Sequence, residues 1–361
     1  MKSSVLVLPK YPRKGASSRL RTYQYLPFLE KMGWDFTVRA LFDEEYLDSL
    51  YNGKGRSRLK MIFLYLYRVM VLFNFKRFDF IWLEKELFPY MPAWIEVLLK
   101  WFGVKYIVDY DDAIFHNYDL SSNRFIRRLL GNKIDVVMRH AYCVIAGNEY
   151  LAERAKLAGA RRVLVIPTVV DHHRYIPRKE TSSGPLTLGW IGSPTTQKYL
   201  EILLPVFQSL TRQYQFRLLL VGATPEIKAK LAGIPVHIEN WSEDTEARHI
   251  QEMDVGIMPL QDGPWEKGKC GYKIIQYMAS GVPVVASPVG VNTAIVNGSN
   301  SGMLANEFSE WGSALAALFS EPRHRHQLGM SGRLAVERKY SIDSQLPRLQ
   351  SCFLPGLATN E

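Results

Sequence analysis

The stretch from Pro264 to Gly290 constrains the fold of this chain most, because it predicts a loop, a helix and a strand in immediate succession. A loop rich in glycine and lysine runs into a helical segment that begins near Gly271. Gly281 can supply a left-handed stop to this helix, and the run Val282–Ala286 is typical of a buried strand. The stretch therefore predicts one αβ unit of an α/β protein.

The same loop and helix start suit a phosphate group. The first turn of a helix leaves backbone N–H groups without intrahelical acceptors, and the helix dipole favours negative charge there. Lys269 and Lys273 add two cations, and Gln276 shares a helix face with Lys273, so its amide can reach a ribose hydroxyl while the ammonium meets a diphosphate. The plainer alternative is a surface lysine cluster beside an ordinary αβ unit.

Composition and charge narrow the class of protein. The 361 residues are enough for two domains, and 47% hydrophobic with 22% charged residues is a globular composition. The net charge of +10 lies in the first half, because residues 1–170 hold 27 Lys and Arg against 17 Asp and Glu, whereas residues 171–361 hold 18 of each. A basic half can attract an anionic membrane surface, a nucleic acid or an acidic substrate. The alternative is a solvated basic surface.

Cysteine usage and apolar runs bear on the compartment. Three cysteines without paired or metal-ligand spacing fit a reducing cytoplasm and predict no metal site. The longest apolar run, 61–75, is too short to span a bilayer, for which about 20 residues are needed, so we expect no transmembrane helix. The helix predicted over 59–73 is apolar on nearly every side. We expect it to be buried with partial membrane contact; burial alone is the alternative.

Two segments of the first half place polar residues at the carboxyl ends of predicted strands. The strand Val5–Leu8 leads into a loop and helix start that carry Gly15 and Arg19, as the opening of a Rossmann-like domain. The strand after Lys105 ends in three carboxylates, of which Asp111 and Asp112 are the last two. Crowded carboxylates predict at least one raised pKa unless a cation compensates.

The run from Lys269 to Gly290, with its Gln-Tyr-Met-Ala-x-Gly-Val-Pro-Val-Val segment, resembles the donor-site motif of family 4 glycosyltransferases of the bacterial surface-polysaccharide type. These are retaining enzymes with the GT-B fold, and the resemblance spans nearly the whole chain. Gln276 and Gly268 stand where the two motif glutamates would be. Ser193 replaces an arginine of the pattern, whereas Lys198 matches its lysine, and the histidine that often precedes the aspartate at Asp112 is absent.

The resemblance implies two Rossmann-like domains that face each other across a cleft. We expect an N-terminal acceptor domain over 1–171, a linker over 172–185, a C-terminal donor domain over 186–340, and a tail over 341–361 that crosses back to the first domain. It also implies that the loop at Gly15 and Arg19 lies near donor phosphate, that the hydroxyl-rich loop after Gly192 and the helix start at Val291 hold the diphosphate, and that Trp241 stacks on the base or joins the core.

The implied reaction is transfer of a sugar from a nucleoside-diphosphate sugar to a hydroxyl of a lipid-linked glycan, with retention and without a metal or other cofactor. Electrostatic stabilisation of the leaving diphosphate is its main catalytic contribution. The candidate catalytic residues are Lys198, Lys273, Asp111 and Asp112. The candidate donor-binding residues are Gly15, Arg19, Gly192, Ser193, Trp241, Lys269, Gly271, Tyr272, Gln276 and Val291.

Other functions are compatible with parts of this pattern. A catalytically silent sugar-nucleotide-binding scaffold would explain the missing glutamates, arginine and histidine. A Rossmann oxidoreductase is disfavoured because the three-glycine dinucleotide fingerprint is missing, and no nucleic-acid-binding module is written in the sequence. We therefore expect a cytoplasmic enzyme, peripheral at the inner face of an anionic membrane, with a nucleotide sugar and a glycan as its partners.

Overall fold

The computed structural model describes residues 3–51, 57–177 and 184–354. The chain forms two compact units. Within the described residues, the first unit takes its members from Met1–Thr168, Gly268–Cys270 and Gln345–Glu361, and the second from Val169–Lys267 and Gly271–Ser344. Residues 178–183 of the expected linker and 355–361 of the expected tail lie outside the described residues.

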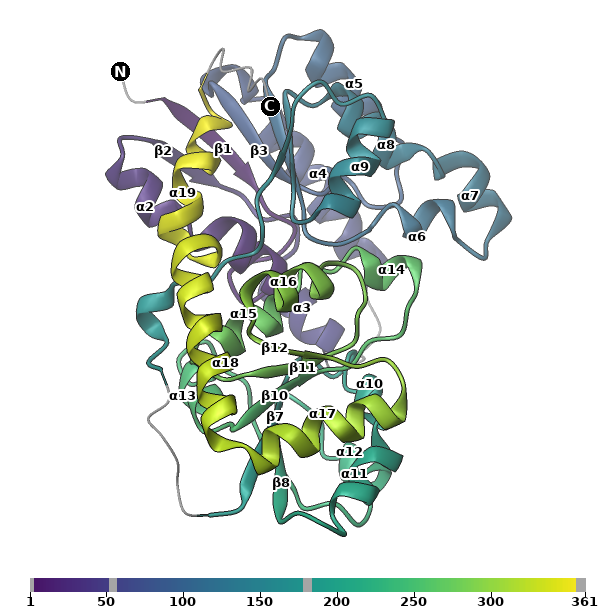
Figure 1. Cartoon of the computed structure of the whole chain (residues 1–361). Helices are drawn as coiled ribbons and strands as arrows, with labels where there is room; N and C mark the ends of the chain where they lie inside the picture. Colours follow the sequence, from purple (N-terminus) through teal and green to yellow (C-terminus); the bar gives the residue numbers. More distant parts are fainter. Residues whose placement is uncertain (1–2, 52–56, 178–183, 355–361) are drawn as a thin grey trace. The chain divides into compact units, whose positions relative to one another are not determined.

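The first unit is built on a parallel sheet of six strands in the order β2-β1-β3-β4-β5-β6 (Figure 1). The strands are β1 (Ser4–Leu8), β2 (Asp35–Val38), β3 (Phe80–Glu84), β4 (Tyr106–Tyr110), β5 (Cys143–Ala146) and β6 (Val163–Val165). Nearly every residue of β1, β3, β4 and β5 is buried, as continuous apolar runs in a parallel sheet covered on both faces require.

The helices of the first unit include the long α4 and several short segments. They are α1 (Ala16–Ser18), the π-helical turn η1 (Arg19–Tyr23), α2 (Leu26–Lys31), α3 (Glu44–Tyr51), α4 (Arg58–Leu72), the 3-10 turn η2 (Phe75–Arg77), α5 (Trp94–Trp101), α6 (His116–Asp119), α7 (Arg124–Leu130), α8 (Lys133–His140) and α9 (Glu149–Leu157). A continuous helical run over 124–139 is the expectation from sequence, but the structure ends one helix at Leu130 and starts the next at Lys133.

The second unit has a parallel sheet in the order β12-β11-β10-β7-β8-β9. Its strands are β7 (Leu186–Ile191), β8 (Phe216–Val221), β9 (Val236–Glu239), β10 (Val255–Met258), β11 (Val284–Ala286) and β12 (Gly302–Leu304). Two parallel α/β sheets are thus present, and the predicted fold class is confirmed.

Helices cover both faces of the second sheet, with α15 and α16 on one side and α11 and α17 on the other (Figure 1). They are the 3-10 turn η3 (His172–Arg174), α10 (Lys198–Glu201), α11 (Leu204–Leu210), α12 (Ile227–Lys230), α13 (Glu246–Gln251), α14 (Pro264–Lys267), α15 (Tyr272–Ala279), α16 (Val291–Ser299), α17 (Phe308–Ser320), α18 (Pro322–Ala335) and the π-helical turn η4 (Val336–Tyr340). The last helix, α19 (Ile342–Ser351), begins in the second unit, and its residues from Gln345 belong to the first.

In each sheet the strand order reverses beside one strand. In the first unit β1 lies between β2 and β3, and in the second unit β7 lies between β8 and β10. Ligands of open α/β sheets bind beyond the carboxyl ends of the strands at such a switch point. The loops that follow β1, β3, β4, β7, β10 and β11 are therefore where a site is expected.

Candidate active site

The loop after β7 forms a hydroxyl-rich turn that starts at a glycine. The Gly192 amide donates to the carbonyl of Val221 at 3.0 Å, and the Ser193 amide donates to Thr196 Oγ1 at 3.2 Å. A Cβ at Gly192 would lie 2.4 Å from the Trp190 ring and 2.8 Å from Lys273 Nζ. Glycine is favoured at this position because the buried Trp190 ring lies so close to the backbone.

Lys273 directs its charge at this turn. Its Nζ lies 3.4 Å from Thr196 Oγ1 and 4.4 Å from the centroid of the Trp190 ring. The face of the buried Trp190 indole attracts the Lys273 ammonium group and holds it in place. The structure therefore brings Lys273, Gly192 and Ser193, three of the candidate residues, into one cluster that joins an ammonium to hydroxyl groups.

Two helix N-termini stand next to this cluster in the second unit. Gly271 has φ 65° and directly precedes α15, and a Cβ there would lie 3.2 Å from Val291 Cγ1, at the first residue of α16. Gly290, with φ 55°, precedes α16 in the same way. Helix N-termini favour anions, so Gly271, Tyr272 and Val291 stand where the sequence places a diphosphate. The predicted helix stop at Gly281 is confirmed by its φ of 66°.

Tyr277 holds α15 against the sheet. Its hydroxyl accepts from the Ile191 amide at 3.1 Å and donates to the Ile257 carbonyl at 3.2 Å, and its ring packs on Gly256. Both bonds end on the last or next-to-last residue of a strand at the switch point. The position of Lys273 on this helix is thereby set by the sheet and not by a surface loop.

Gln276 and Trp241 belong to a buried hydrogen-bond network. Gln276 Nε2 donates to the Tyr175 hydroxyl at 3.1 Å, Tyr175 donates to Glu246 Oε1 at 3.0 Å, and Trp241 Nε1 donates to Glu246 Oε2 at 2.9 Å. Burial, with Tyr272 and Glu246 adding to it, raises the pKa of Tyr175 well above its ordinary value. The side-chain amide of Gln276 thus has a hydrogen-bond partner within the chain, which the sequence alone does not predict.

Lys198 is exposed at the start of α10, and its Nζ lies 5.3 Å from the Tyr199 ring centroid. Tyr199 in turn donates to Glu266 Oε1 at 2.5 Å, which ties α10 to α14. Glu266 stands two positions before Gly268, which takes the place of the first motif glutamate. The Tyr199 side chain that binds Glu266 belongs to the residue directly after Lys198.

Asp111 and Asp112 of the first unit share one buried lysine. Lys85 Nζ lies 2.8 Å from Asp111 Oδ1, 3.3 Å from Asp112 Oδ2 and 3.2 Å from Ser17 Oγ. Burial acts to raise the pKa of Asp111, but Lys85 outweighs it and holds that pKa below its ordinary value. For Asp112 burial, together with the Asp111 charge, prevails over Lys85 and raises the pKa. The raised pKa that the sequence predicts is therefore found for Asp112 and not for Asp111.

Lys85 is a member of this cluster that sequence reasoning leaves out. It directly follows β3, is buried, and has a φ of 65°, which is unusual for a residue other than glycine. Such strained backbone is found at functional sites more than elsewhere. A charged triplet at the end of a buried strand, Glu84-Lys85-Glu86, is the signal that points to it.

Asp109 has a different partner from Asp111 and Asp112. Its Oδ1 accepts from Arg21 Nε at 2.8 Å, and both side chains are buried. Burial raises the pKa of Asp109 to about 6, against the opposing effect of Arg21. Arg21 also donates to the Ile166 carbonyl, so this pair joins η1 to β4 and to the segment after β6.

Gly15 and Arg19 flank the short helix α1. A Cβ at Gly15 would lie 2.5 Å from Tyr11 Cβ, so close packing of the loop requires the glycine. The Arg19 amide donates to the Gly15 carbonyl at 2.9 Å, and the Arg19 side chain is buried. Neither residue is a solvated helix-start residue.

The segment Gly268–Cys270, which contains Lys269, belongs to the first unit. Asn148 Nδ2 donates to the carbonyls of Gly268 and Lys269 at 3.0 and 2.9 Å, while its Oδ1 caps α9. The charge of Lys269 acts to lower the pKa of Asp112. Of the candidate residues, Gly15, Arg19, Asp111, Asp112 and Lys269 therefore lie in the first unit and the rest in the second.

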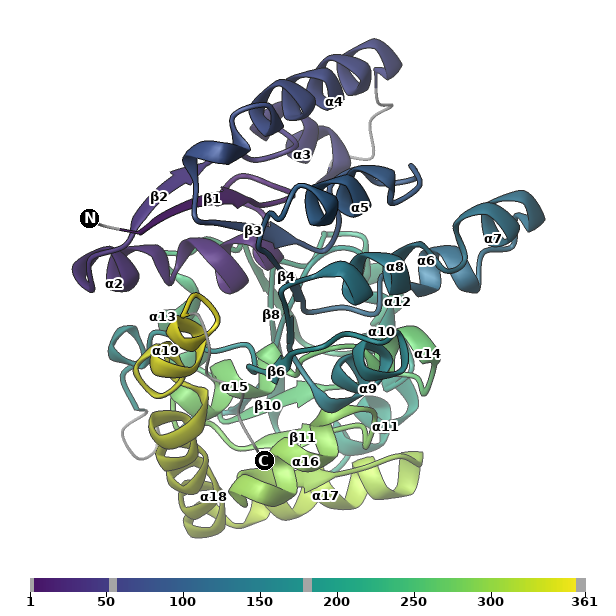
Figure 2. The same cartoon turned by 90° about the horizontal axis from the view of Figure 1, so that it is seen from above.

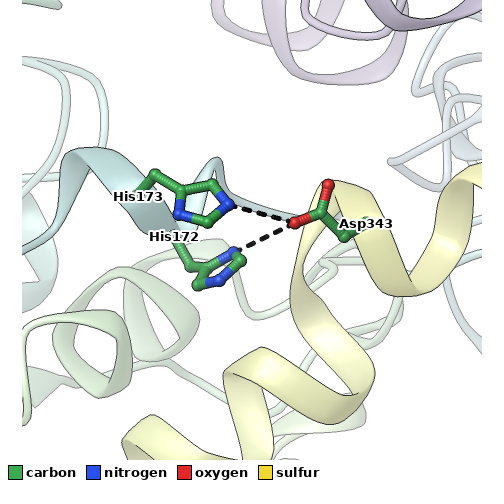
Figure 3. A group of neighbouring side chains, drawn as sticks. All are labelled: His172, His173 and Asp343. Carbon is green, nitrogen blue, oxygen red and sulfur yellow. Dashed lines mark hydrogen bonds and ion pairs between the residues drawn. The ribbon is translucent and has the colours of Figure 1, made fainter.

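One group among the described residues has the composition of a metal site: His172, His173 and Asp343 (Figure 3). Both imidazoles point at one carboxylate oxygen, with His173 Nε2 at 3.2 Å and His172 Nδ1 at 3.8 Å from Asp343 Oδ2. The His173 and Asp343 side chains are 72% and 54% exposed. Two histidines facing one carboxylate make an ion pair when protonated, and this accounts for the geometry without a metal.

The sequence of the second unit matches a known family. Residues 185–321 match the family model described as "Glycosyl transferases group 1". No curated protein matches the chain significantly.

Solved structures resemble the chain over nearly its whole length. A sucrose-phosphate synthase from Thermosynechococcus elongatus has a TM-score of 0.72 and 15% identity, covering 97% of this chain and 98% of that one. Anabaena Alr3699/HepE in complex with UDP-glucose has a TM-score of 0.70 and 15% identity, covering 97% and 100%. WaaG, a glycosyltransferase involved in lipopolysaccharide biosynthesis, has a TM-score of 0.68 and 14% identity, covering 98% and 100%.

Two parallel six-stranded sheets and these similarities define the chain as a protein of the GT-B fold. Within its second unit, residues 185–321 are similar in sequence to the group 1 glycosyl transferases. The resemblance read from the lysine-rich loop is confirmed.

Proposed function

We propose that this enzyme moves a hexose from a uridine-diphosphate sugar to a hydroxyl group of a lipid-linked glycan, with retention of the anomeric configuration. The observation that carries the proposal is the position of Lys273, with its Nζ 3.4 Å from Thr196 Oγ1 over the turn after Gly192. An ammonium, a hydroxyl-rich turn and two helix N-termini are the groups that a diphosphate requires.

In the proposed reaction the bond between the anomeric carbon and the diphosphate oxygen breaks, and the acceptor hydroxyl oxygen forms the new bond on the same face of the sugar. The hydroxyl proton passes to a donor phosphate oxygen. Lys273 and Lys198 stabilise the charge that develops on the leaving diphosphate. Lys cannot reproduce the bidentate fork of the arginine that Ser193 replaces, so the two ammonium groups share its role.

The first unit supplies the acceptor side of this proposal. Asp111 and Asp112, oriented by Lys85, would accept hydrogen bonds from acceptor or sugar hydroxyls. Gly15, Arg19 and Lys269 complete the donor contacts from this unit. In domain terms, residues 1–171 form the acceptor domain, 172–185 the linker, 186–340 the donor domain, and 341–361 the returning tail.

The base of the donor is inferred from the relatives. The structures of HepE in complex with UDP-glucose and of a TarM mutant in complex with UDP share this fold with the present chain. In the second unit, Trp241 follows β9, Tyr272 and Val291 are the first residues of α15 and α16, and Gln276 lies one turn further along α15. These residues would contact the uridine and its ribose, with the Glu246 network holding Trp241 in place.

The acceptor is inferred from charge. The excess of basic residues in the first half favours an anionic membrane surface, where lipid-linked glycans reside. Among the described residues no helix is both long enough and apolar enough to cross a bilayer. We therefore place the enzyme at the cytoplasmic face of the membrane as a peripheral protein.

A thermal-shift screen against UDP, GDP, dTDP, CMP and NAD tests the donor class first. A ligand at 100 times its dissociation constant stabilises the folded state by ~2.7 kcal/mol. A shift with UDP is expected. A shift with NAD alone, or with none of the nucleotides, would refute the assignment of the second unit.

Turnover is tested next by following UDP release from UDP-sugars with a lipid-linked acceptor. Lys273→Ala and Lys198→Ala should each lower turnover by at least ~10²-fold. Lys230→Ala is the matched control, because Lys230 pairs with Glu201 on the surface of the same unit. UDP binding without any transfer would favour a silent sugar-nucleotide-binding scaffold, and normal rates in both lysine variants would remove the mechanism.

A further inference from the structure

Helix α4 carries an apolar stripe on its outward face. Leu59, Ile62, Phe63, Leu66, Met70 and Phe73 recur at intervals of three and four residues, and all six are exposed. Phe63 is 69% and Phe73 is 79% exposed. Residues at this spacing share one helix face, so the exposure is one continuous stripe and not scattered single residues.

The inward face of the same helix is firmly attached to the first unit. The buried guanidinium of Arg68 donates to the carbonyls of Pro9 and Arg39 at 3.0 and 3.2 Å, and the Tyr65 hydroxyl donates to the Pro89 carbonyl at 2.8 Å. The alternative that α4 is buried alone is therefore wrong, because one face of the helix is exposed. The helix has two apolar faces, and the protein core covers one of them.

Helices α5 and α7 carry further exposed apolar residues. Trp94, Leu98 and Trp101 follow the same three- and four-residue spacing on α5, and both tryptophans are largely exposed. Phe75, just after α4, contacts Phe102, just after α5, at a ring-centroid distance of 5.8 Å. In Figure 2 the three helices lie along the upper right of the first unit. We call the exposed apolar residues of α4, α5 and α7, with Phe73 and Phe102 that end the first two helices, the apolar face.

The concentration of exposed apolar residues in this region is unusual. Among the described residues, 22 large apolar side chains are exposed, and 16 of them lie between Leu59 and Leu129. Soluble proteins rarely expose apolar patches of this extent, and such patches mark contact sites for partners or membranes.

The charges around the apolar face distinguish these partners. Between residues 57 and 130, eight basic side chains are exposed against one acidic side chain, Asp79. Arg124, Arg127 and Arg128 of α7 stand beside the exposed Phe125 and Leu129. The other carboxylates of this stretch are buried or half-buried. A second copy of the chain would bring two such basic surfaces together, whereas an anionic bilayer compensates them.

We propose that the apolar face of α4 and α5 inserts into the interfacial region of an anionic bilayer, with the arginines of α7 against the lipid headgroups. Phenylalanine on the exposed face of α4 and tryptophan on that of α5, with basic residues nearby, are typical of helices that lie in the membrane interface. This inference rests on the proposed function for its purpose, since it places the first unit beside a lipid-linked acceptor.

The experiment is flotation of the purified enzyme with phosphatidylcholine vesicles, with and without phosphatidylglycerol. The wild-type protein should float with the anionic vesicles, and less so as salt is added. Phe63→Gln combined with Phe73→Gln should weaken this binding by at least ~10-fold. Arg124→Gln, Arg127→Gln and Arg128→Gln together should weaken it by at least ~10-fold on anionic vesicles alone.

A matched control uses Leu157→Gln and Phe308→Gln, which replace exposed apolar residues outside the apolar face and should leave vesicle binding unchanged. Insertion is read directly from tryptophan quenching by brominated lipids. Trp94→Phe with Trp101→Phe keeps the face apolar and should abolish most of the quenching while binding persists.

Two results would overturn the proposal. One is wild-type protein that stays unbound to anionic vesicles while forming a dimer that the phenylalanine variants disrupt, since a second copy would then cover the face. The other is vesicle binding that the control variants reduce as much as the phenylalanine variants do. The UDP thermal shift is measured on the same samples, so loss of membrane binding is separable from failure of the donor assignment.

Discussion

The Lys85→Met substitution tests whether the carboxylates of the first unit depend on one buried cation. Lys85 is 7% exposed and lies within 3.3 Å of carboxylate oxygens on both Asp111 and Asp112. Removing one partner of a buried ion pair costs about 3–5 kcal/mol, because the remaining charge has no compensation. For a unit of this size each kcal/mol lowers the melting temperature by about 2–4 °C, so a drop of roughly 6–20 °C is expected at neutral pH.

The loss of stability in Lys85→Met should depend on pH, and the structure determines in which direction. Without Lys85, burial and mutual repulsion raise the folded-state pKa values of Asp111 and Asp112 above those in the unfolded chain. A group with a raised folded-state pKa favours folding at low pH, and that contribution is lost as the pH rises through this pKa. The variant should therefore approach wild-type stability near pH 5 and fall furthest behind it at pH 7 and above.

Differential scanning fluorimetry over this pH range measures the effect. The control is Lys14→Met, because Lys14 pairs with Asp48 in the same unit with both side chains about half exposed, and exposed pairs contribute ~0–1 kcal/mol. Combining Lys85→Met with Asp111→Asn should restore part of the lost stability. An equal drop at pH 5 and pH 7.5, or as large a drop in Lys14→Met, would refute the reasoning.

Two further predictions concern the second unit. Gly271→Ala should lower stability by about 1–2 kcal/mol and weaken UDP binding, because an alanine at φ 65° is strained and its Cβ would meet Ile295 at 2.4 Å; urea unfolding and a UDP titration measure this. Its matched control, Gly298→Ala within α16, meets no atom within 4 Å and should be neutral or stabilising. His173→Ala, like added EDTA, should leave UDP release unchanged, since no step of the proposed transfer needs a metal; a loss of rate in either would make the His172, His173 and Asp343 group a metal site.

The sequence predicts the strands well because parallel sheets leave a strong local signal. Continuous apolar runs such as Val5–Leu8 and Leu218–Val221 favour burial, and the structure places them inside its two sheets. The glycine with positive φ at Gly281 is readable for the same reason, since few other residues tolerate that backbone. Elements of this kind can be predicted because the signal lies in their own residues.

The sequence predicts less about residues whose role depends on distant partners. Lys85 lies 26 positions from Asp111, and although both follow predicted strands, nothing local shows that the two side chains form a pair. The sequence shows that α4 is apolar on nearly every side but not which side the core covers. The network of Gln276, Tyr175 and Glu246 joins three elements, so it becomes visible only in the fold.

This network accounts for the glutamine at position 276, where the motif that the sequence resembles has a glutamate. The Tyr175 hydroxyl donates its single proton to Glu246, so it can only accept from residue 276, and an amide provides that donor. An ionised glutamate there would bring a second buried carboxylate to the same phenol. Gln276→Glu should therefore cost about 1–3 kcal/mol in urea unfolding, with part of the loss recovered by Glu246→Gln. If Gln276→Glu is neutral or stabilising instead, the network is not what selects the amide.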